Sequence, residues 1–337
     1  MTDRPVIWIS RRLSDATLAR ATRDYECLIN HEDQPSTPDQ IIAMSHRVDG
    51  IIACHSEIFD AEIIGRLAPR LRIIANHSVG TDHCDLPGLR ARNITVTNTP
   101  DVLSDATGEI ALLLMLGAAR RAVEGERLVR SGAWDFWSPA FMVGKQVTGQ
   151  RLGIVGMGRV GQVMARNARG LNMEIHYHNQ RRLPAEIEQG AIYHSTLESL
   201  LPVADFLSLH CPATDKTTGI MNGERLAMMP DGAVLINCAR GTLVDEAALL
   251  QALNSGKLAA AGLDCFVDEP GGNPAFAVHE NIFMLPHIGS ATRATRDAMG
   301  FRALDNLDAF FAGMTPGDLV NWPAVQLAFG VIGVRGD

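Results

Sequence analysis

Short apolar runs alternate with segments of helical periodicity along almost the whole chain, and this alternation limits the possible folds more than any other feature. In the first part of the chain the apolar runs lie at 6–10, 26–30, 50–55, 72–78 and 94–98. Helical periodicity occurs between them, at 14–24, 37–47 and 60–68. Because parallel strands are joined by helical crossovers, the pattern predicts βαβ units and one small open α/β domain in this part.

A second series of apolar runs begins after residue 150 and lies at 151–156, 174–179, 191–194, 205–211, 233–239, 259–266 and 281–286. We expect it to form a doubly wound parallel sheet of about seven strands. The pattern from 291 to 314 predicts one long helix, which is long enough to lead back to the first domain. Both ends of the chain are therefore expected in the same domain.

The segment between the two series differs from both of them. A helical pattern begins near Val102, and residues 108–120 are apolar on too many faces for an exposed helix. We expect a domain junction or a subunit interface to bury this helix. Residues 133–150 contain two Trp, two Phe and one Pro, break the pattern, and are predicted to form a long connecting loop.

Length and charge limit the partners of the chain. With 337 residues it exceeds the size at which one core usually keeps growing, so two domains are expected. The net charge of -8 argues against nucleic acid or anionic lipid as a partner. A small anionic substrate would then be bound by a local cluster of donors.

The lack of a recognisable targeting segment and the spacing of the cysteines favour a reducing compartment. The N-terminal region has no apolar stretch typical of a signal sequence, and no later apolar run is long enough to span a bilayer. We therefore expect a cytoplasmic protein that does not bind membranes. The six cysteines include no CxxC pair and no zinc-like spacing with histidine, so we expect free thiols and no metal site.

A glycine motif follows the first strand of the second series. Gly156, Gly158 and Gly161 have GxGxxG spacing, and apolar residues at helical spacing follow them. In this motif the glycines allow a tight turn, the close approach of a pyrophosphate, and close packing of helix on strand. A bare match also occurs in ordinary turns, but the strand before it and the helix after it favour a dinucleotide site.

The end of the next strand bears on which dinucleotide binds. Enzymes that use NAD place Asp or Glu there to bind the adenosine ribose, whereas this chain has Asn179, Gln180, Arg181 and Arg182. A carboxylate would repel the additional phosphate of NADP, and guanidinium groups would bind it. NADP(H) is therefore favoured. Alternatively, the two arginines form a solvated turn, and NAD(H) is used as well.

Three polar residues follow strands of the second series, where ligands gather in open α/β sheets: Arg240, Glu269 and His287. Reduction of a 2-oxo acid needs a cation for the carboxylate, a proton donor, and a group that keeps the donor protonated. These three residues fit those roles one to one. A single His or Glu of this kind is more often a turn residue, so their shared placement carries the argument.

At this point the sequence resembles the D-isomer-specific 2-hydroxyacid dehydrogenase family over essentially the whole chain. The resemblance is carried by the glycine segment and by motifs at 78–83 (SVGTDH), 99–112 (TPDVLSDATGEIAL), 237–246 (NCARGTLVDE), 262–270 (GLDCFVDEP) and 286–292 (PHIGSAT). It implies two doubly wound parallel α/β domains. These are a flavodoxin-like substrate domain at 1–99 and 289–337 and a Rossmann cofactor domain at 100–288.

The same resemblance implies residue roles. His287 would be the acid/base, Glu269 its partner, and Arg240 the group that binds the substrate, with backbone N–H groups at Val79 and Gly80 holding the substrate carboxylate. The remaining candidate cofactor contacts are Thr107, Arg159, Val160, Cys211, Pro212, Cys238, Asp264 and Ser290.

Within the family, Asn179 with Arg181 and Arg182 resembles the branch that reduces glyoxylate and hydroxypyruvate with NADPH. Phosphite dehydrogenases are an alternative: they have Lys where this chain has Val79, although the sequence around Trp134 and Trp137 is similar to theirs. Many 3-phosphoglycerate dehydrogenases have an additional regulatory domain, for which no residues remain after the last helix. A non-catalytic nicotinamide sensor is the alternative from another class.

The predicted loop contains an aromatic cluster, which comprises Trp134, Phe136, Trp137, Phe141 and Met142. One interpretation is a small satellite core. The other is that the loop covers the substrate pocket of a second subunit, with Trp137 as a substrate contact, as the resemblance implies for related reductases. The apolar helix at 108–120 and the resemblance together predict a homodimer. The charged residues at 120–130 are interpreted as a solvated helix face.

Overall fold

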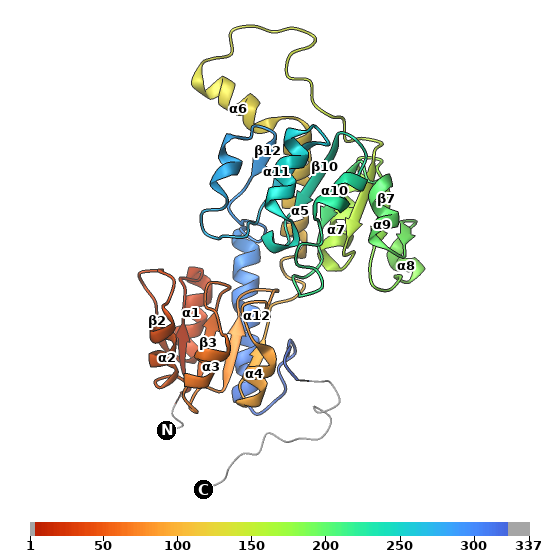
Figure 1. The fold of residues 1–337 in the computed structure, drawn as a ribbon. Coiled ribbons are helices and arrows are strands. Elements are labelled where there is room, and N and C mark those ends of the chain that lie inside the picture. The colour runs from red at the N-terminus through yellow and green to blue at the C-terminus, as the bar shows by residue number, and fades with distance from the viewer. Residues whose placement is uncertain (1–3, 323–337) are drawn as a thin grey trace. The chain divides into compact units, whose positions relative to one another are not determined.

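The computed structural model describes residues 4–322, which divide into two compact units (Figure 1). Within the described residues, unit 1 comprises 4–103 and 291–322, and unit 2 comprises Ser104–Ser290. Unit 1 is therefore built from two segments that are far apart in the chain.

Unit 1 contains a five-stranded parallel sheet in the order β2-β1-β3-β4-β5, which is the flavodoxin-like order. Its strands are β1 (Val6–Ile9), β2 (Glu26–Ile29), β3 (Gly50–Ala53), β4 (Ile73–Asn76) and β5 (Thr95–Thr97). Its helices are α1 (Asp15–Asp24), α2 (Pro38–Ser45), α3 (Ala61–Arg66), α4 (Leu86–Ala91) and α12 (Arg293–Phe311).

Local sequence explains where the helices of unit 1 begin. Ser14, Thr37 and Asp60 each cap a helix with a side-chain oxygen that accepts a backbone N–H. The three predicted helices of this region and the long C-terminal helix are confirmed. Helix α4 was not predicted, because its six residues include Pro87 and Gly88 and show no helical periodicity.

Unit 2 contains a seven-stranded parallel sheet in the order β12-β11-β10-β9-β6-β7-β8, so the predicted second sheet is confirmed. Its strands are β6 (Arg151–Val155), β7 (Glu174–His178), β8 (Ile192–His194), β9 (Phe206–Leu209), β10 (Ala233–Asn237), β11 (Leu258–Leu263) and β12 (Ile282–Met284). Its α-helices are α5 (Ser104–Ala119), α6 (Ala122–Ser131), α7 (Arg159–Arg169), α8 (Ala185–Glu188), α9 (Leu197–Leu200), α10 (Gly223–Met228) and α11 (Glu246–Asn254). Three short 3₁₀ turns lie at Leu201–Val203, Gly241–Leu243 and Pro274–Val278. The strand order reverses between β6 and β9, as in Rossmann domains.

Each sheet is covered on both faces, and the alternation of side chains along a strand sorts them into two cores. In β10, Leu235 packs in one apolar cluster while Val234 and Ile236 pack in the other. In β3, Ile51 and Ile52 divide in the same way. Strands buried on both faces are continuously apolar, which is why the sequence shows runs and not alternation.

Helix α5 is buried by the sheet of its own unit. An ideal Cβ on Gly117 would lie 2.6 Å from the Phe283 ring, and one on Gly262 would lie 2.7 Å from the Leu114 carbonyl oxygen. The expectation that a domain junction or subunit interface buries this helix is therefore not needed, because glycines let β11 and β12 approach it closely. Among residues 4–322, no helix is long and apolar enough to cross a membrane.

Candidate active site

The carboxyl edge of the unit 2 sheet carries most of the predicted site residues. The loops after β6, β7, β9, β10, β11 and β12 contain Gly156, Asn179, Cys211, Arg240, Glu269 and His287, respectively. In a parallel sheet all of these loops leave from the same edge, and ligands bind where the strand order reverses.

The three glycines of the motif lie in different surroundings. Gly156 has a φ of +92°, and a Cβ there would lie 2.6 Å from the Cys211 amide nitrogen. A Cβ on Gly161 would lie 2.4 Å from the Gly156 carbonyl oxygen. Gly158, in contrast, faces open space and begins α7 without a side-chain cap. The first and third glycines thus serve packing, and the second leaves room for a phosphate group beside N–H groups at the helix end.

Asn179 ties the glycine loop to the end of β7. Its side-chain oxygen accepts the Met157 N–H at 2.7 Å, and the Gly156 N–H donates to the His178 carbonyl oxygen at 3.0 Å. The Asn179 oxygen is thus used within the protein, which leaves its NH₂ group as the polar atom to offer to a ribose or phosphate. An amide at this position lacks the negative charge by which Asp or Glu excludes a phosphate. The group that would fit this loop is therefore a dinucleotide with a pyrophosphate at Gly158.

His287 and Glu269 form a hydrogen-bonded pair. His287 Nδ1 lies 2.5 Å from Glu269 Oε2, and the other carboxylate oxygen, Oε1, accepts the Phe266 N–H at 2.8 Å. A carboxylate only accepts, so Nδ1 carries the hydrogen of this bond, and Nε2 is the ring nitrogen that does not face Glu269. The His287 side chain is 32% exposed and that of Glu269 21%, so the pair remains accessible.

The backbone at His287 adopts an unusual conformation. Its φ is +52°, in the left-handed region that few residues other than glycine adopt. Asp264 holds the residues that follow, since its two carboxylate oxygens accept the N–H groups of Ile288 and Gly289, both at 2.8 Å. Backbone strain of this kind persists only where the surroundings enforce it. Asp264 supplies that enforcement.

Asp264 is only 1% exposed, and burial raises its pKa to about 6 against the opposing effect of the two backbone N–H bonds. The resemblance implies that this residue is a cofactor contact. In the structure its oxygens are occupied by the backbone after His287, so it positions the His287 loop.

Arg240 is brought beside the Glu269 loop by close backbone packing. A Cβ on Gly241 would lie 1.9 Å from the Phe266 carbonyl carbon, so only glycine allows these two loops to touch. Asn237 shapes the turn: its NH₂ donates to the Arg240 carbonyl oxygen at 2.8 Å, and its oxygen accepts the Ala239 N–H at 3.1 Å. Sequence reasoning did not select Asn237, although a polar residue that ends an otherwise apolar strand could have indicated it.

Known proteins are similar to this chain in sequence and in fold. A family model described as the NAD-binding domain of D-isomer specific 2-hydroxyacid dehydrogenases matches residues 112–289. The chain is 40% identical over 329 residues to a glyoxylate reductase from Thermococcus kodakarensis, covering 96% of this chain and 98% of that one. It is 39% identical over 309 residues to a glycerate dehydrogenase from Hyphomicrobium methylovorum, with 91% and 96% covered. The chain belongs to the D-isomer specific 2-hydroxyacid dehydrogenase family.

A solved structure extends the likeness to three dimensions. The NADPH-dependent glyoxylate/hydroxypyruvate reductase from Sinorhizobium meliloti, in complex with NADP and malonate, matches with a TM-score of 0.83 at 32% identity. The match covers 94% of this chain and 97% of that one. As a member of the family, the chain is an oxidoreductase, and its unit 2 contains the family's NAD-binding domain.

Further predicted cofactor contacts of this 2-hydroxyacid dehydrogenase lie around the same edge. A Cβ on Gly289 would lie 3.4 Å from the hydroxyl oxygen of Thr107, which is buried in the first turn of α5 next to the residues after His287. Ser290 is half-buried, and Arg159 and Val160 form the first turn of α7.

The predicted thiols near the cofactor are free and protonated. Burial raises the pKa of Cys211 to about 11 and that of Cys238 to about 12, and all six cysteines are unpaired with one another. The Cys238 thiol lies 3.6 Å from Nδ1 of His210, a half-buried histidine whose pKa falls to about 4 because desolvation disfavours its charged form. His210 was not predicted. It directly follows β9, and the exposed Pro212 lies two residues further along the chain.

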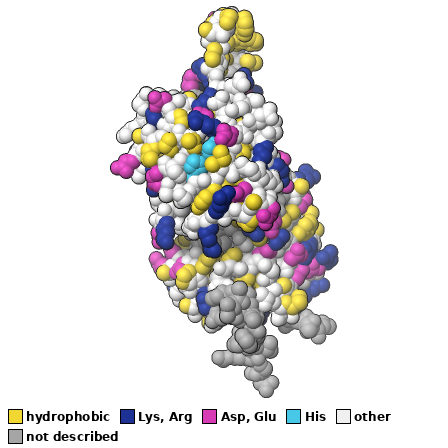
Figure 2. All heavy atoms as spheres, turned by 90° about the vertical axis from the view of Figure 1, so that its right-hand side faces the viewer, with side chains coloured by type: hydrophobic (Ala, Val, Ile, Leu, Met, Phe, Trp, Pro, Cys, Tyr) yellow, Lys and Arg dark blue, Asp and Glu magenta, His cyan; other side chains and the backbone are white. Residues whose placement is uncertain are grey.

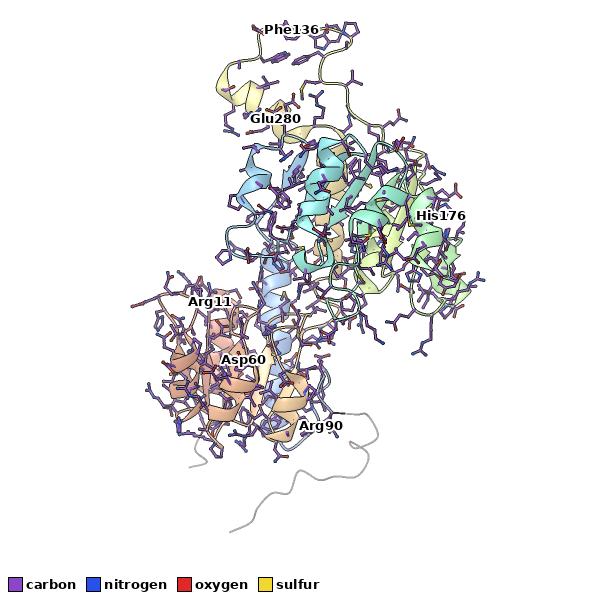
Figure 3. The ribbon with its side chains drawn as sticks, viewed as in Figure 1. Arg11, Asp60, Arg90, Phe136, His176 and Glu280 are labelled. Carbon is purple, nitrogen blue, oxygen red and sulfur yellow. The ribbon has the colours of Figure 1, made fainter. Side chains whose placement is uncertain are left out.

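The structure pairs one of the two predicted phosphate-binding arginines. Arg182 forms two hydrogen bonds with the buried Glu188, at 2.8 and 3.0 Å. Gln180 and Arg181 are exposed. This corner follows the end of β7, the strand in which Figure 3 labels His176.

In unit 1, the predicted substrate loop has its carbonyl groups occupied. The Ser78 hydroxyl donates to the Gly80 carbonyl oxygen at 2.6 Å, and the Asn98 NH₂ donates to that of Val79 at 2.9 Å. The loop is thereby held in a defined conformation, with Val79 exposed.

The aromatic loop carries little core of its own. The Phe136 and Phe141 rings lie 4.7 Å apart, but Trp137 is 73% exposed. Phe136 lies at the end of the loop in Figure 3, and Figure 2 shows hydrophobic side chains gathered at this end, at the top of the view. The adjacent helix α6 contains no buried residue and has ion pairs along its surface, as expected for a solvated face.

Proposed function

We propose that this 2-hydroxyacid dehydrogenase reduces a small 2-oxo acid, of the glyoxylate or hydroxypyruvate type, to the D-2-hydroxy acid with NADPH. The observation that carries the proposal is the accessible His287–Glu269 pair at the same sheet edge as a glycine loop that fits a dinucleotide. The names of the relatives support it: glyoxylate reductase, glycerate dehydrogenase, and an NADPH-dependent glyoxylate/hydroxypyruvate reductase.

In this proposal, bound NADPH supplies the hydride that reduces the carbonyl carbon. His287 protonates the oxygen that becomes the hydroxyl, and Glu269 keeps Nδ1 as the donor side of the ring and stabilises the imidazolium. Arg240 binds the substrate carboxylate and polarises the carbonyl. The backbone N–H groups of Val79 and Gly80 are proposed as further carboxylate donors. Residues 1–99 and 289–337 are accordingly proposed as the substrate domain and residues 100–288 as the cofactor domain.

The preference for NADPH rests on the charge of the β7 corner. An amide at Asn179 replaces the carboxylate expected of an NAD enzyme, and arginines follow it. The Sinorhizobium relative was solved with NADP bound. NADH is expected to support a slower reaction, because every contact except that with the additional phosphate is retained.

The test is the initial rate of reduced-nicotinamide oxidation by the purified chain, with NADPH and NADH against glyoxylate, hydroxypyruvate, pyruvate and a bulky aromatic 2-oxo acid. Fast turnover of the small acids with a preference for NADPH is expected. Bound cofactor without turnover of any of the four acids would contradict the proposal. That result would favour another substrate, such as phosphite or 3-phosphoglycerate, or a nicotinamide-sensing role.

We also propose that the protein is a homodimer in which the aromatic loop contacts the second subunit. The exposed cluster of Trp134, Phe136 and Trp137 supports this, since such apolar patches mark interaction sites. Trp137 would then lie against the substrate of the second subunit. Sedimentation equilibrium should give twice the monomer mass, and a monomer would contradict the proposal.

A further inference from the structure

The loop between β7 and α8 is held by a buried carboxylate. Arg182 donates from Nε to Glu188 Oε1 at 2.8 Å and from Nη2 to Oε2 at 3.0 Å, which is a bidentate pair. The Tyr177 hydroxyl also donates to Glu188 Oε1, at 2.5 Å, and accepts the Leu183 N–H at 2.9 Å. The network therefore links strand β7, the loop itself and the end of α8.

Glu188 is only 5% exposed, and Tyr177 is fully buried. The pKa of Glu188 lies below its usual value, first because of its hydrogen bonds with Arg182 and second because of that with Tyr177, so the carboxylate is charged at neutral pH. The main chain of Glu188 is fixed as well, since Arg169 of α7 donates to its carbonyl oxygen at 2.7 Å.

A buried charge that loses its partner is strongly destabilising. If Arg182 turned toward a phosphate group, it would leave Glu188 with Tyr177 as its remaining side-chain donor. The guanidinium is thus committed within the protein, although the Arg182 side chain is largely exposed along its length.

Arg181 has the opposite surroundings. It is exposed, and no residue in the described part of the chain forms a hydrogen bond or ion pair with its guanidinium group. Two residues before it, Asn179 accepts the Met157 N–H, and two residues after it, the Leu183 N–H donates to the Tyr177 hydroxyl. The backbone of Arg181 is therefore held on both sides. Arg181 is therefore presented at the surface of an ordered loop with all five N–H donors available.

We propose that Arg181 is the arginine that binds the 2′-phosphate of the cofactor, and that Arg182 is a positioning residue that holds the loop through Glu188. This division of roles rests on the proposed preference for NADPH. It assigns Glu188 and Tyr177, which no sequence motif indicated, to cofactor selectivity.

The experiment measures binding of two probes to the full chain by calorimetry: adenosine 2′,5′-bisphosphate and 5′-AMP, which differ only in the 2′-phosphate. Arg181→Gln should weaken binding of the bisphosphate by about 10- to 100-fold, since a hydrogen bond to a charged group is lost, and leave 5′-AMP unchanged. Arg120→Gln, at an exposed arginine at the end of α5, is the matched control and should change neither.

The role of Arg182 is tested by rescue. Arg182→Met should lower the melting temperature because Glu188 loses its charged partner, and Arg182→Met with Glu188→Met should restore it, since a buried ion pair can be replaced by apolar residues. The restored double variant should still prefer the bisphosphate. A folded double variant that has lost this preference as fully as Arg181→Gln would overturn the division of roles.

The outcomes also separate this inference from the proposed function. A wild-type chain that binds both probes equally would overturn the preference for NADPH and the role of Arg181 together. A wild-type chain that discriminates, with Arg181→Gln discriminating equally well, would overturn only the inference.

Discussion

Two buried carboxylates lie at the carboxyl edge of the unit 2 sheet, and they differ in their partners. Asp264, near β12, accepts two backbone N–H groups, and its pKa rises to about 6. Glu188, near β7, accepts an arginine and a tyrosine hydroxyl, and its pKa falls below the usual value. Burial opposes ionisation of both, but only the guanidinium brings a full compensating charge.

The difference separates two kinds of support. Asp264 holds the backbone of the residue proposed to transfer a proton, whereas Glu188 holds the loop proposed to select the cofactor. The corner near β12 should therefore control the rate and the corner near β7 the binding. Three predictions test this comparison.

The largest expected effect is on the rate. His287→Asn should lower kcat by about 10²- to 10⁴-fold, because the proton donor is lost while Asn tolerates the left-handed backbone at this position. The affinity for NADP⁺, measured by calorimetry, should be unchanged. His31→Asn, at an exposed histidine of unit 1, is the control. A kcat within tenfold of wild type would remove His287 from the chemistry.

The second prediction concerns the pH dependence of stability, which should have opposite signs for the two carboxylates. The folded pKa of Asp264 is about 6, above the ordinary 3.8. The contribution of its protonated form to the free energy of unfolding is therefore fully present below about pH 4 and is lost as the pH rises to about 6. The loss amounts to about 3 kcal/mol. For Glu188 the folded pKa is lowered from 4.5, so its contribution is present above that pH and lost as pH falls.

Both effects are measured as the free energy of unfolding in urea at each pH, with hydrogen exchange of peptides from unit 2 as the probe of unfolding. From pH 4 to 6, wild type should lose stability relative to Asp264→Asn. Below pH 4.5 it should lose stability relative to Glu188→Gln. Asp268→Asn, an exposed acid near Glu269, serves as the control. If the free energy of unfolding changed with pH equally in the two variants, the choice between backbone N–H groups and a guanidinium as partner would not set the charge state of the carboxylate.

The smallest effect applies the same comparison of structural and ligand roles to the glycine loop. Gly158→Ala should fold normally, since its Cβ meets nothing within 4 Å, but bind NADP⁺ about tenfold more weakly because the methyl group occupies the phosphate approach. Gly156→Ala should lower stability by about 1–3 kcal/mol, owing to its positive φ and contact with Cys211. Unchanged NADP⁺ affinity in Gly158→Ala would contradict the ligand role of this glycine.

Much of the fold was predictable because it depends on local pattern. Continuous apolar runs indicated the strands, Ser14 and Thr37 stand where helices begin, and the glycine spacing located the turn after β6. The strand-end positions of Arg240, Glu269 and His287 were also readable, and the structure brings Glu269 and His287 into contact.

The supporting contacts were not predictable, because they join residues whose spacing has no periodic meaning. Asp264 meets the backbone of Ile288 only because β11 and β12 are neighbours in the sheet. Glu188 meets Arg182 because a one-turn helix reverses the chain over Tyr177. The burial of α5 likewise depends on glycines in other elements, such as Gly262. In the sequence alone, nothing distinguishes these residues from other acids and glycines.

Gly289 lies against Thr107, so the first and last residues of unit 2 come together although they are far apart in the chain. A domain whose two ends lie close together can be inserted between two adjacent positions of another domain. Residues 104–290 should therefore be portable: they are suited to expression as an independent fragment, to circular permutation through a short linker, or to exchange with the corresponding segment of a relative.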